Sequence, residues 1–143
     1  MKKKTVSKLK KDLWKVFSRY VRLRDAVRTT GNCKSSLCIT CERLEDITKM
    51  DAGHFFSRTH SATLFHEKNV HAQCKRCNML NGGEQFLYAQ KVDKLYGEGT
   101  AEELNQLRHT TKRFSRPELE DMIEEYKEKL NELIDDYGTP WQG

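Results

Sequence analysis

The stretch Cys38-Ile39-Thr40-Cys41, together with Cys74-Lys75-Arg76-Cys77, decides the fold of this 143-residue chain. Four thiolates in two Cys-x-x-Cys pairs suit one tetrahedral zinc ion. A bare four-cysteine ribbon leaves about 15 to 20 residues between its pairs. Here 32 residues separate the pairs, enough for a two-stranded hairpin whose ends the metal ties together. The sequence therefore predicts one structural Zn²⁺ with four ligands: Cys38, Cys41, Cys74 and Cys77.

Composition favours zinc over disulfide bonds. The cysteine count is five, which is odd, and no apolar leader segment is present; both argue against a secreted disulfide framework. Cys33 is left without a ligand role. Hydrophobic residues make up 36% of the chain and charged residues 33%, so the core is lean, and bound zinc can add on the order of 10 kcal/mol to folding.

The hydropathy of the sequence predicts that the protein does not span a membrane. A spanning helix needs about 20 apolar residues in a row, and the longest apolar run is 86–89. We expect a soluble protein of a reducing cytoplasm, organised as one domain over residues 1–143. Its predicted parts are a basic helix at 5–30, a zinc-containing core at 33–80 and a helical C-terminal part at 84–137.

Helical patterns flank a central region of strands, which indicates the α+β class. Apolar residues recur at helical spacing in the first and last of these parts. Capping boxes are predicted where Thr100 precedes Glu103 and where Ser115 precedes Glu118. Between the helices, 37–40 and 52–56 are predicted strands. The stripe of the last helix suits packing against the first helix or against a second copy of the protein.

The polar residues between and just after the cysteine pairs are those that phosphodiester hydrolysis requires. The unperturbed pKa of histidine lies near neutrality, so His54 is suited to act as a general base. A hard cation such as Mg²⁺ or Mn²⁺ prefers oxygen ligands, which Asp51 and Asn78 offer. These residues predict a metal-assisted nuclease with one catalytic divalent ion besides the zinc.

Charge is concentrated in a way that favours DNA as the partner. The net charge is +5, and residues 1–28 hold eleven Lys and Arg against two Asp. Residues 115–143 hold nine acids against three basic residues. A basic surface attracts polyanions. The predicted phosphate contacts are Lys15, Arg19 and Arg22 on the first helix, and Arg58, His60, Lys75 and Arg76 near the cysteines.

A resemblance to a known family rests on five segments. They are Phe17-Ser18-Arg19-Tyr20, Arg22-Leu23-Arg24-Asp25, Asp51-Ala52-Gly53-His54-Phe55, Ser57-Arg58-Thr59-His60-Ser61-Ala62, and Asn69-Val70-His71-Ala72-Gln73-Cys74-Lys75-Arg76-Cys77-Asn78. In these segments the chain resembles the NinG/Rap recombination proteins of lambdoid phages and, more broadly, the HNH or ββα-metal nucleases. The resemblance extends from about residue 13 to 96.

The resemblance implies a fold and an activity. The fold would be a small zinc-pinned ββα-metal core between N- and C-terminal helices. The activity would be that of a DNA endonuclease that cuts branched DNA such as Holliday junctions in phage recombination, in the bacterial host cytoplasm. His54 would be the general base, Asn78 a metal ligand, and Asn69 would orient the His54 ring through its amide.

One departure from the HNH pattern concerns the acidic metal ligand. Many HNH enzymes place it immediately before the base histidine, where this chain has Gly53. We assign the role to Asp51, which requires a bulge or bend in the strand.

Other functions are compatible with the same residues. A general HNH nuclease, a non-catalytic zinc-stabilised DNA-binding module and a thiol redox protein each account for some of them. Cutting both strands of a symmetric junction needs two active sites, so we expect a homodimer.

Overall fold

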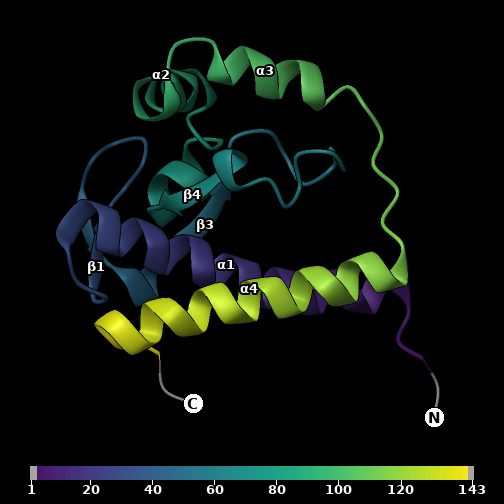
Figure 1. Ribbon diagram of the computed structural model, residues 1–143. Helices are drawn as coiled ribbons and strands as arrows, with labels where there is room; N and C mark the ends of the chain where they lie inside the picture. Colours follow the sequence, from purple (N-terminus) through teal and green to yellow (C-terminus); the bar gives the residue numbers. More distant parts are fainter. Residues whose placement is uncertain (1–2, 142–143) are drawn as a thin grey trace.

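The computed structural model describes residues 3–141 as an α+β structure with two small antiparallel sheets (Figure 1). In chain order the elements are α1 Val6–Thr30, β1 Ser35–Leu37, β2 Leu44–Asp46, η1 Ile47–Lys49, β3 Asp51–His54, η2 Glu67–Asn69, β4 Val70–Gln73, η3 Arg76–Leu80, α2 Gln85–Tyr96, α3 Thr100–Leu107 and α4 Arg116–Tyr137. Within residues 3–141, no helix is long and apolar enough to cross a membrane.

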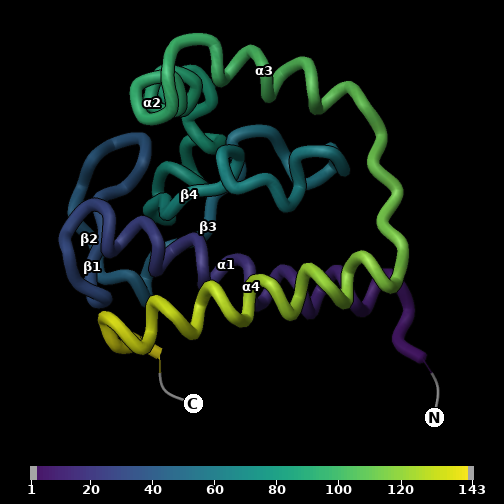
Figure 2. Tube along the Cα trace, viewed as in Figure 1, coloured from purple at the N-terminus to yellow at the C-terminus, as the bar shows by residue number. Residues whose placement is uncertain are grey.

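The two long helices, α1 and α4, run in the same direction along one side of the molecule (Figure 2). The Thr5 side chain caps α1 by accepting a hydrogen bond from the N–H of Lys8, and Gly31 ends it with φ of 78°. Ser115 caps α4 through the N–H of Glu118, so this capping position is confirmed. Because the helices are parallel, the chain must return across the molecule between them.

The apolar faces of α1 and α4 pack against each other, which confirms the intramolecular partner for the last helix. The ring of Phe17 meets that of Tyr126 edge to face with centroids 4.9 Å apart. The shared buried cluster contains Leu9, Leu13, Phe17, Val21, Phe65, Val70, Leu119, Ile123 and Tyr126. This part of the stripe is therefore unavailable to a second copy, and the homodimer stays a prediction.

The β3–β4 hairpin lies between the α1/α4 layer and the α2/α3 layer (Figure 1). Its register is continuous, from Asp51 opposite Gln73 to His54 opposite Val70. Side chains alternate along a strand, so Gly53 and His71 share the face toward α2, while His54 belongs to the face toward α1. The short helix η3 begins at Arg76, separated from the end of β4 by two residues.

The expected strand and cap positions are partly wrong. The segment 37–40 contributes only Leu37 to β1, because the chain turns at the first cysteine pair, and β3 ends at His54, two residues before the predicted end. Thr100 is the first residue of α3, and its hydroxyl donates to the carbonyl of Gly97 at 2.8 Å. It is therefore not the capping residue of that helix.

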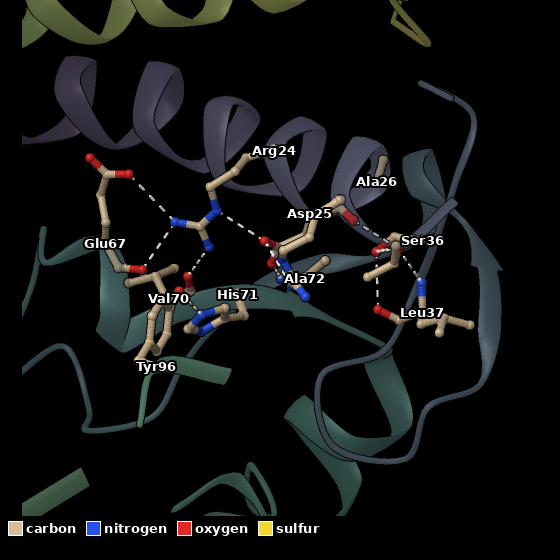
Figure 3. A network of polar contacts seen from close by, with 12 residues as sticks. Arg24, Asp25, Ala26, Ser36, Leu37, Glu67, Val70, His71, Ala72 and Tyr96 are labelled. Atoms are coloured by element: carbon tan, nitrogen blue, oxygen red, sulfur yellow. Dashed lines mark hydrogen bonds and ion pairs between the residues drawn. The ribbon is translucent and has the colours of Figure 1, made fainter. Parts of the chain in front are cut away.

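Two adjacent residues of α1 fasten this helix to β4 (Figure 3). The Arg24 guanidinium donates to the carbonyls of Glu67 and Val70 at 3.0 and 2.8 Å. The Asp25 carboxylate accepts from the Arg24 Nε at 2.9 Å and from the Ala72 N–H at 2.8 Å. Burial would raise the pKa of Asp25, but the charge of Arg24 holds it below its ordinary value. The buried pair thus fixes the hairpin against α1.

Candidate functional site

The four predicted zinc ligands converge at one point. The sulfur atoms of Cys38, Cys41, Cys74 and Cys77 all lie within 4.8 Å of one another. Zn–S bonds of about 2.3 Å in a tetrahedron place sulfurs about 3.8 Å apart, and the Cys41 and Cys74 sulfurs are 3.8 Å apart. The cluster could therefore hold a metal ion. Cys33 is outside it.

Hydrogen bonds to sulfur support thiolate ligands in this cluster. The backbone N–H of Cys74 donates to the Cys38 sulfur at 3.3 Å, and the Thr40 hydroxyl lies 3.4 Å from that sulfur. Burial opposes ionisation of Cys38, but these bonds lower its pKa to about 7. Since metals bind the thiolate form, the surroundings of Cys38 favour binding, whereas burial raises the pKa of Cys41 and of Cys77.

His54, the last residue of β3, is half-buried and neutral. Burial, aided by the charge of Arg58, lowers the pKa of His54 to about 4. Its Nε2 lies 3.1 Å from the carbonyl oxygen of Leu64. A carbonyl only accepts hydrogen bonds, so Nε2 carries the proton and Nδ1 keeps its lone pair. Within residues 3–141 no hydrogen bond engages Nδ1, which leaves it free to accept a proton.

An aromatic stack holds the His54 ring in place. The Trp14 side chain of α1 lies against His54 with ring centroids 4.8 Å apart and an interplanar angle of 22°. The Arg58 guanidinium lies 4.7 Å from the Trp14 ring centroid. Among the described residues Arg58 has no other polar contact, so its donors face solvent. The stack places an available cation beside the histidine.

Asp51 and Asn78 are in direct contact. The Asn78 Nδ2 donates to Asp51 Oδ2 at 3.0 Å, and the Lys75 Nζ lies 2.8 Å from Asp51 Oδ1. Partial burial would raise the pKa of Asp51, but these two donors hold it below its ordinary value. The carboxylate is ionised at neutral pH. Rotation of the Asn78 amide by 180° exchanges its nitrogen and oxygen, so both residues can offer oxygen to a cation.

Two adjoining hollows bring these residues into one site. One, of about 460 Å³, is lined by His54; the other, of about 430 Å³, is lined by Asp51. The two share Trp14, Arg58 and Asn78. His54, Asp51, Asn78 and the Arg58 cation therefore line two hollows that share part of their wall.

Comparison with known sequences identifies the family. A family model described as the bacteriophage lambda NinG protein matches residues 1–136. The chain belongs to the NinG family. It is 30% identical over 97 residues to protein ninG of Escherichia phage lambda, and 30% identical over 99 residues to protein ninG of Salmonella phage P22. Those alignments cover 67% and 68% of this chain, and 47% and 48% of the relatives.

This NinG-family chain thus spans about half the length of the curated relatives that it matches. No solved structure matches it.

Among residues 3–141 of this NinG-family chain, no hydrogen bond joins the Asn69 amide to His54, so the expected direct hydrogen bond is wrong. Its Oδ1 accepts from the Phe56 N–H at 2.9 Å, and its Nδ2 donates to the carbonyls of Phe56 and Thr63 at 3.0 Å each. These bonds fix the ends of the loop that carries Leu64, whose carbonyl orients the His54 ring. Asn69 therefore supports the histidine through the backbone.

The expected strand bulge is also absent, because β3 pairs with β4 without an extra residue. A steric restriction, and not a bend in the strand, explains the glycine at position 53. A Cβ at this position would lie 2.1 Å from the Oε1 of Gln73, which is fully buried. Any side chain here would collide with Gln73, so an acid immediately before His54 does not fit this hairpin.

The predicted phosphate contacts fall into two groups. Arg58, Lys75 and Arg76 are exposed and His60 is half-buried, all close in sequence to residues of the site. On α1, Lys15 is exposed, whereas Arg19 and Arg22 are half-buried. Lys15 and Arg19 line a groove of about 840 Å³ together with acids of α4, Glu120, Asp121 and Glu124.

Arg22 is mostly enclosed by the fold. Its Nε donates to the Ser18 carbonyl at 3.0 Å, and Trp141 lies over the guanidinium with its ring centroid 5.0 Å away. Burial lowers the pKa of Arg22. DNA contacts by this face of α1 stay a prediction.

Sequence reasoning missed the residues that brace the site from either side. Trp14 lies beside the apolar stripe of α1, and only its being an aromatic in a basic helix could have drawn attention to it. His71 is buried, with Nδ1 3.1 Å from the Tyr88 hydroxyl and Nε2 2.6 Å from the Tyr96 hydroxyl. Tyr88 in turn donates to the Gly53 carbonyl at 2.7 Å. This chain connects α2 to the strand that carries His54.

Proposed function

We propose that this NinG-family protein is a metal-dependent DNA endonuclease of the HNH type that cuts branched DNA. The observation that carries the proposal is the convergence of His54, Asp51 and Asn78 on adjoining hollows beside a four-cysteine cluster. A two-stranded hairpin followed by a short helix supplies all three residues. This is the order of elements in a ββα-metal core.

The reaction is hydrolysis of a phosphodiester. The His54 Nδ1 takes a proton from water as the water oxygen bonds to phosphorus, and the bond from phosphorus to the 3′ oxygen breaks. The Leu64 carbonyl keeps the proton of the neutral ring on Nε2, and Trp14 keeps the ring from rotating. Arg58 reaches the phosphate as a cation.

Asp51 and Asn78 would hold one Mg²⁺ or Mn²⁺. When bound, it would supply positive charge that stabilises the scissile phosphate and the leaving oxygen. For Asp51 to bind it, the Lys75 ammonium must leave the carboxylate, and a nearby DNA phosphate offers Lys75 another partner. The cysteine cluster would hold structural Zn²⁺, since its four sulfur ligands leave no position for water.

Branched DNA is proposed as the substrate because the segments around the site resemble the NinG/Rap recombination proteins. Two cuts in a symmetric four-way junction require two sites, so we propose a homodimer. The face of α4 that packs against α1 is excluded as its contact surface. A solution mass of one chain at micromolar concentration, with and without junction DNA, would contradict the dimer.

The test is cleavage of a labelled synthetic four-way junction and a matched linear duplex, with Mg²⁺, with Mn²⁺ and with EDTA. We expect paired cuts in the junction alone, absent with EDTA and lost in Asn78→Ala. Asn131→Ala, an exposed asparagine on α4, is the matched control and should cut normally. Cutting of both substrates would indicate a general HNH nuclease.

A second function has one observation in its favour. Both oxygens of Asp51 are engaged by Lys75 and Asn78, an arrangement that also suits a non-catalytic zinc-stabilised DNA-binding module. Binding of the junction without any metal-dependent cleavage would favour this alternative.

A further inference from the structure

Three large apolar side chains are exposed next to the candidate site. Met79 is 68% exposed, Leu80 81% and Phe86 82%. Full exposure of a leucine and a phenylalanine is unfavourable in water, and neighbouring exposed apolar residues mark interaction sites. The other large exposed apolar residues, Leu37, Leu44 and Tyr137, belong to β1, β2 and the end of α4.

A hydrogen-bonded turn holds these side chains in place. Leu80 ends η3 and Phe86 is the second residue of α2, with the turn between them. The N–H of Gly83 donates to the carbonyl of Cys77 at 2.8 Å, which ties the turn to the cysteine cluster. Gln85 donates from its side chain to the carbonyl of Phe55 at 3.1 Å, which ties the start of α2 to the end of the hairpin.

The turn also forms part of the wall of the site. Gly83 and Gln85 line the hollow that contains His54, and Met79 lines the hollow that contains Asp51. Leu80 and Phe86 flank that wall on either side of the turn. A DNA strand that continues from the hollows along this turn would meet these apolar side chains.

The surrounding charge indicates what that partner is. Lys75 and Arg76 are exposed within η3 or immediately before it, and Arg58 is exposed across the hollow. Apolar side chains among cations fit nucleic acid, since phosphates pair with the cations and apolar wedges enter between bases. A stable protein partner needs about 800 Å² from each side, far more than three side chains supply.

We propose that Leu80 and Phe86, with Met79 behind them, enter the branch point of a DNA junction and contact the base faces exposed where the duplex arms meet. A continuous duplex offers no such faces without unstacking, which costs a few kcal/mol per step. The apolar residues would thereby select branched over linear DNA. This inference rests on the proposed function and names the feature that recognises its substrate.

The experiment measures binding apart from cleavage. The full chain is titrated, in Ca²⁺ and separately in EDTA, into a four-way junction with 2-aminopurine at the branch point, and into a matched linear duplex. Wild type should bind the junction more tightly and raise 2-aminopurine fluorescence. The double variant Leu80→Ala/Phe86→Ala should lose about tenfold in junction affinity and lose the fluorescence rise, with linear affinity unchanged. Leu44→Ala, an exposed leucine on β2, is the control.

Other outcomes overturn the inference in distinguishable ways. If the double variant keeps both junction preference and fluorescence while Mg²⁺-dependent cutting continues, the apolar residues do not read the branch, and the proposed function survives. If wild type is a dimer in solution and the double variant a monomer, the apolar residues bind a second copy. If wild type neither binds nor cuts either DNA, the proposed function fails together with the inference.

Discussion

The β3–β4 hairpin carries His71 on the face toward α2 and His54 on the face toward α1. Burial lowers the pKa of both, to about 3 and about 4. Both nitrogens of His71 are engaged by tyrosine hydroxyls, whereas His54 uses only Nε2. Burial lowers the pKa of the two histidines to similar values, so burial alone does not distinguish their roles. What separates a structural histidine from a candidate base is whether one ring nitrogen remains unpaired and faces solvent.

The largest loss of stability should come from a change in the cysteine cluster, because it loosens the β3–β4 hairpin on both of its faces. Cys74 directly follows β4, so Cys74→Ser removes a ligand at the point where the hairpin joins the cluster. We expect loss of one bound zinc per chain and a fall in free energy of unfolding of several kcal/mol, up to about 10. Metal analysis and urea unfolding measure this. Cys33→Ser, outside the cluster, should keep its metal; equal metal content in both variants would contradict the assignment.

His54→Ala should affect chemistry alone. Removal of a general base lowers cleavage rates about 10²- to 10⁴-fold, while junction affinity and thermal stability change little because the ring is only half-buried. Single-turnover cleavage and binding in Ca²⁺ measure the two effects separately. His109→Ala, at an exposed position, serves as control. A His54→Ala protein that unfolds or no longer binds would place His54 with His71 as a structural residue.

Asn69→Ala tests whether Asn69 orients His54 indirectly, by fixing the loop that carries Leu64. The variant leaves the N–H and carbonyl of Phe56 without partners and removes one of the two donors to the Thr63 carbonyl. This should cost about 3 kcal/mol of stability, and it should reduce cleavage as Leu64 shifts. Urea unfolding and hydrogen exchange at the Phe56 amide measure the loop directly. Asn69→Asp keeps an acceptor for Phe56 and should be milder. Loss of cleavage with unchanged stability would instead support direct contact between Asn69 and His54.

The smallest expected effect is the pH dependence of stability that arises from His71, on the face of the hairpin toward α2. Below the ordinary pKa of 6.5 the unfolded chain binds a proton that folded His71 does not bind until about pH 3. Stability should therefore fall as pH is lowered from 6.5, by about 1.4 kcal/mol per pH unit for each such histidine. His71→Phe should remove one such contribution from the slope of unfolding free energy between pH 6.5 and 5.5. Asn131→Phe, at an exposed position without a titratable group, should leave the slope unchanged, and equal slopes for both variants would refute the account.

The parts of the site that the sequence predicted are those encoded by local spacing. The convergence of the cysteines follows from two Cys-x-x-Cys pairs, and the position of Asn78 follows from its place after Cys77. The capping of α4 follows from Ser115, and its apolar stripe predicted a packing partner without deciding between α1 and a second copy of the protein. Each of these depends on residues close together in the chain or on one repeating pattern.

The parts that the sequence did not predict depend on the path of the backbone. The acceptor for His54 is the carbonyl of Leu64, and a carbonyl carries no sequence signal. Trp14 reaches His54 from a helix 40 residues earlier only because Arg24 and Asp25 fix that helix against β4. A bulge or bend was expected in the strand of Gly53, yet the glycine is required by the side chain of Gln73 on the neighbouring strand.

The parallel arrangement of α1 and α4 sets an order of events during synthesis. The cysteine cluster can close once Cys77 has left the ribosome, and the hairpin can form at that point. The apolar face of α1 cannot be covered by α4 until Tyr126 has been synthesised, so it is exposed through most of translation. Contacts so distant in sequence form slowly. We therefore expect early metal binding to protect the nascent chain, and zinc starvation during expression to direct it toward aggregation.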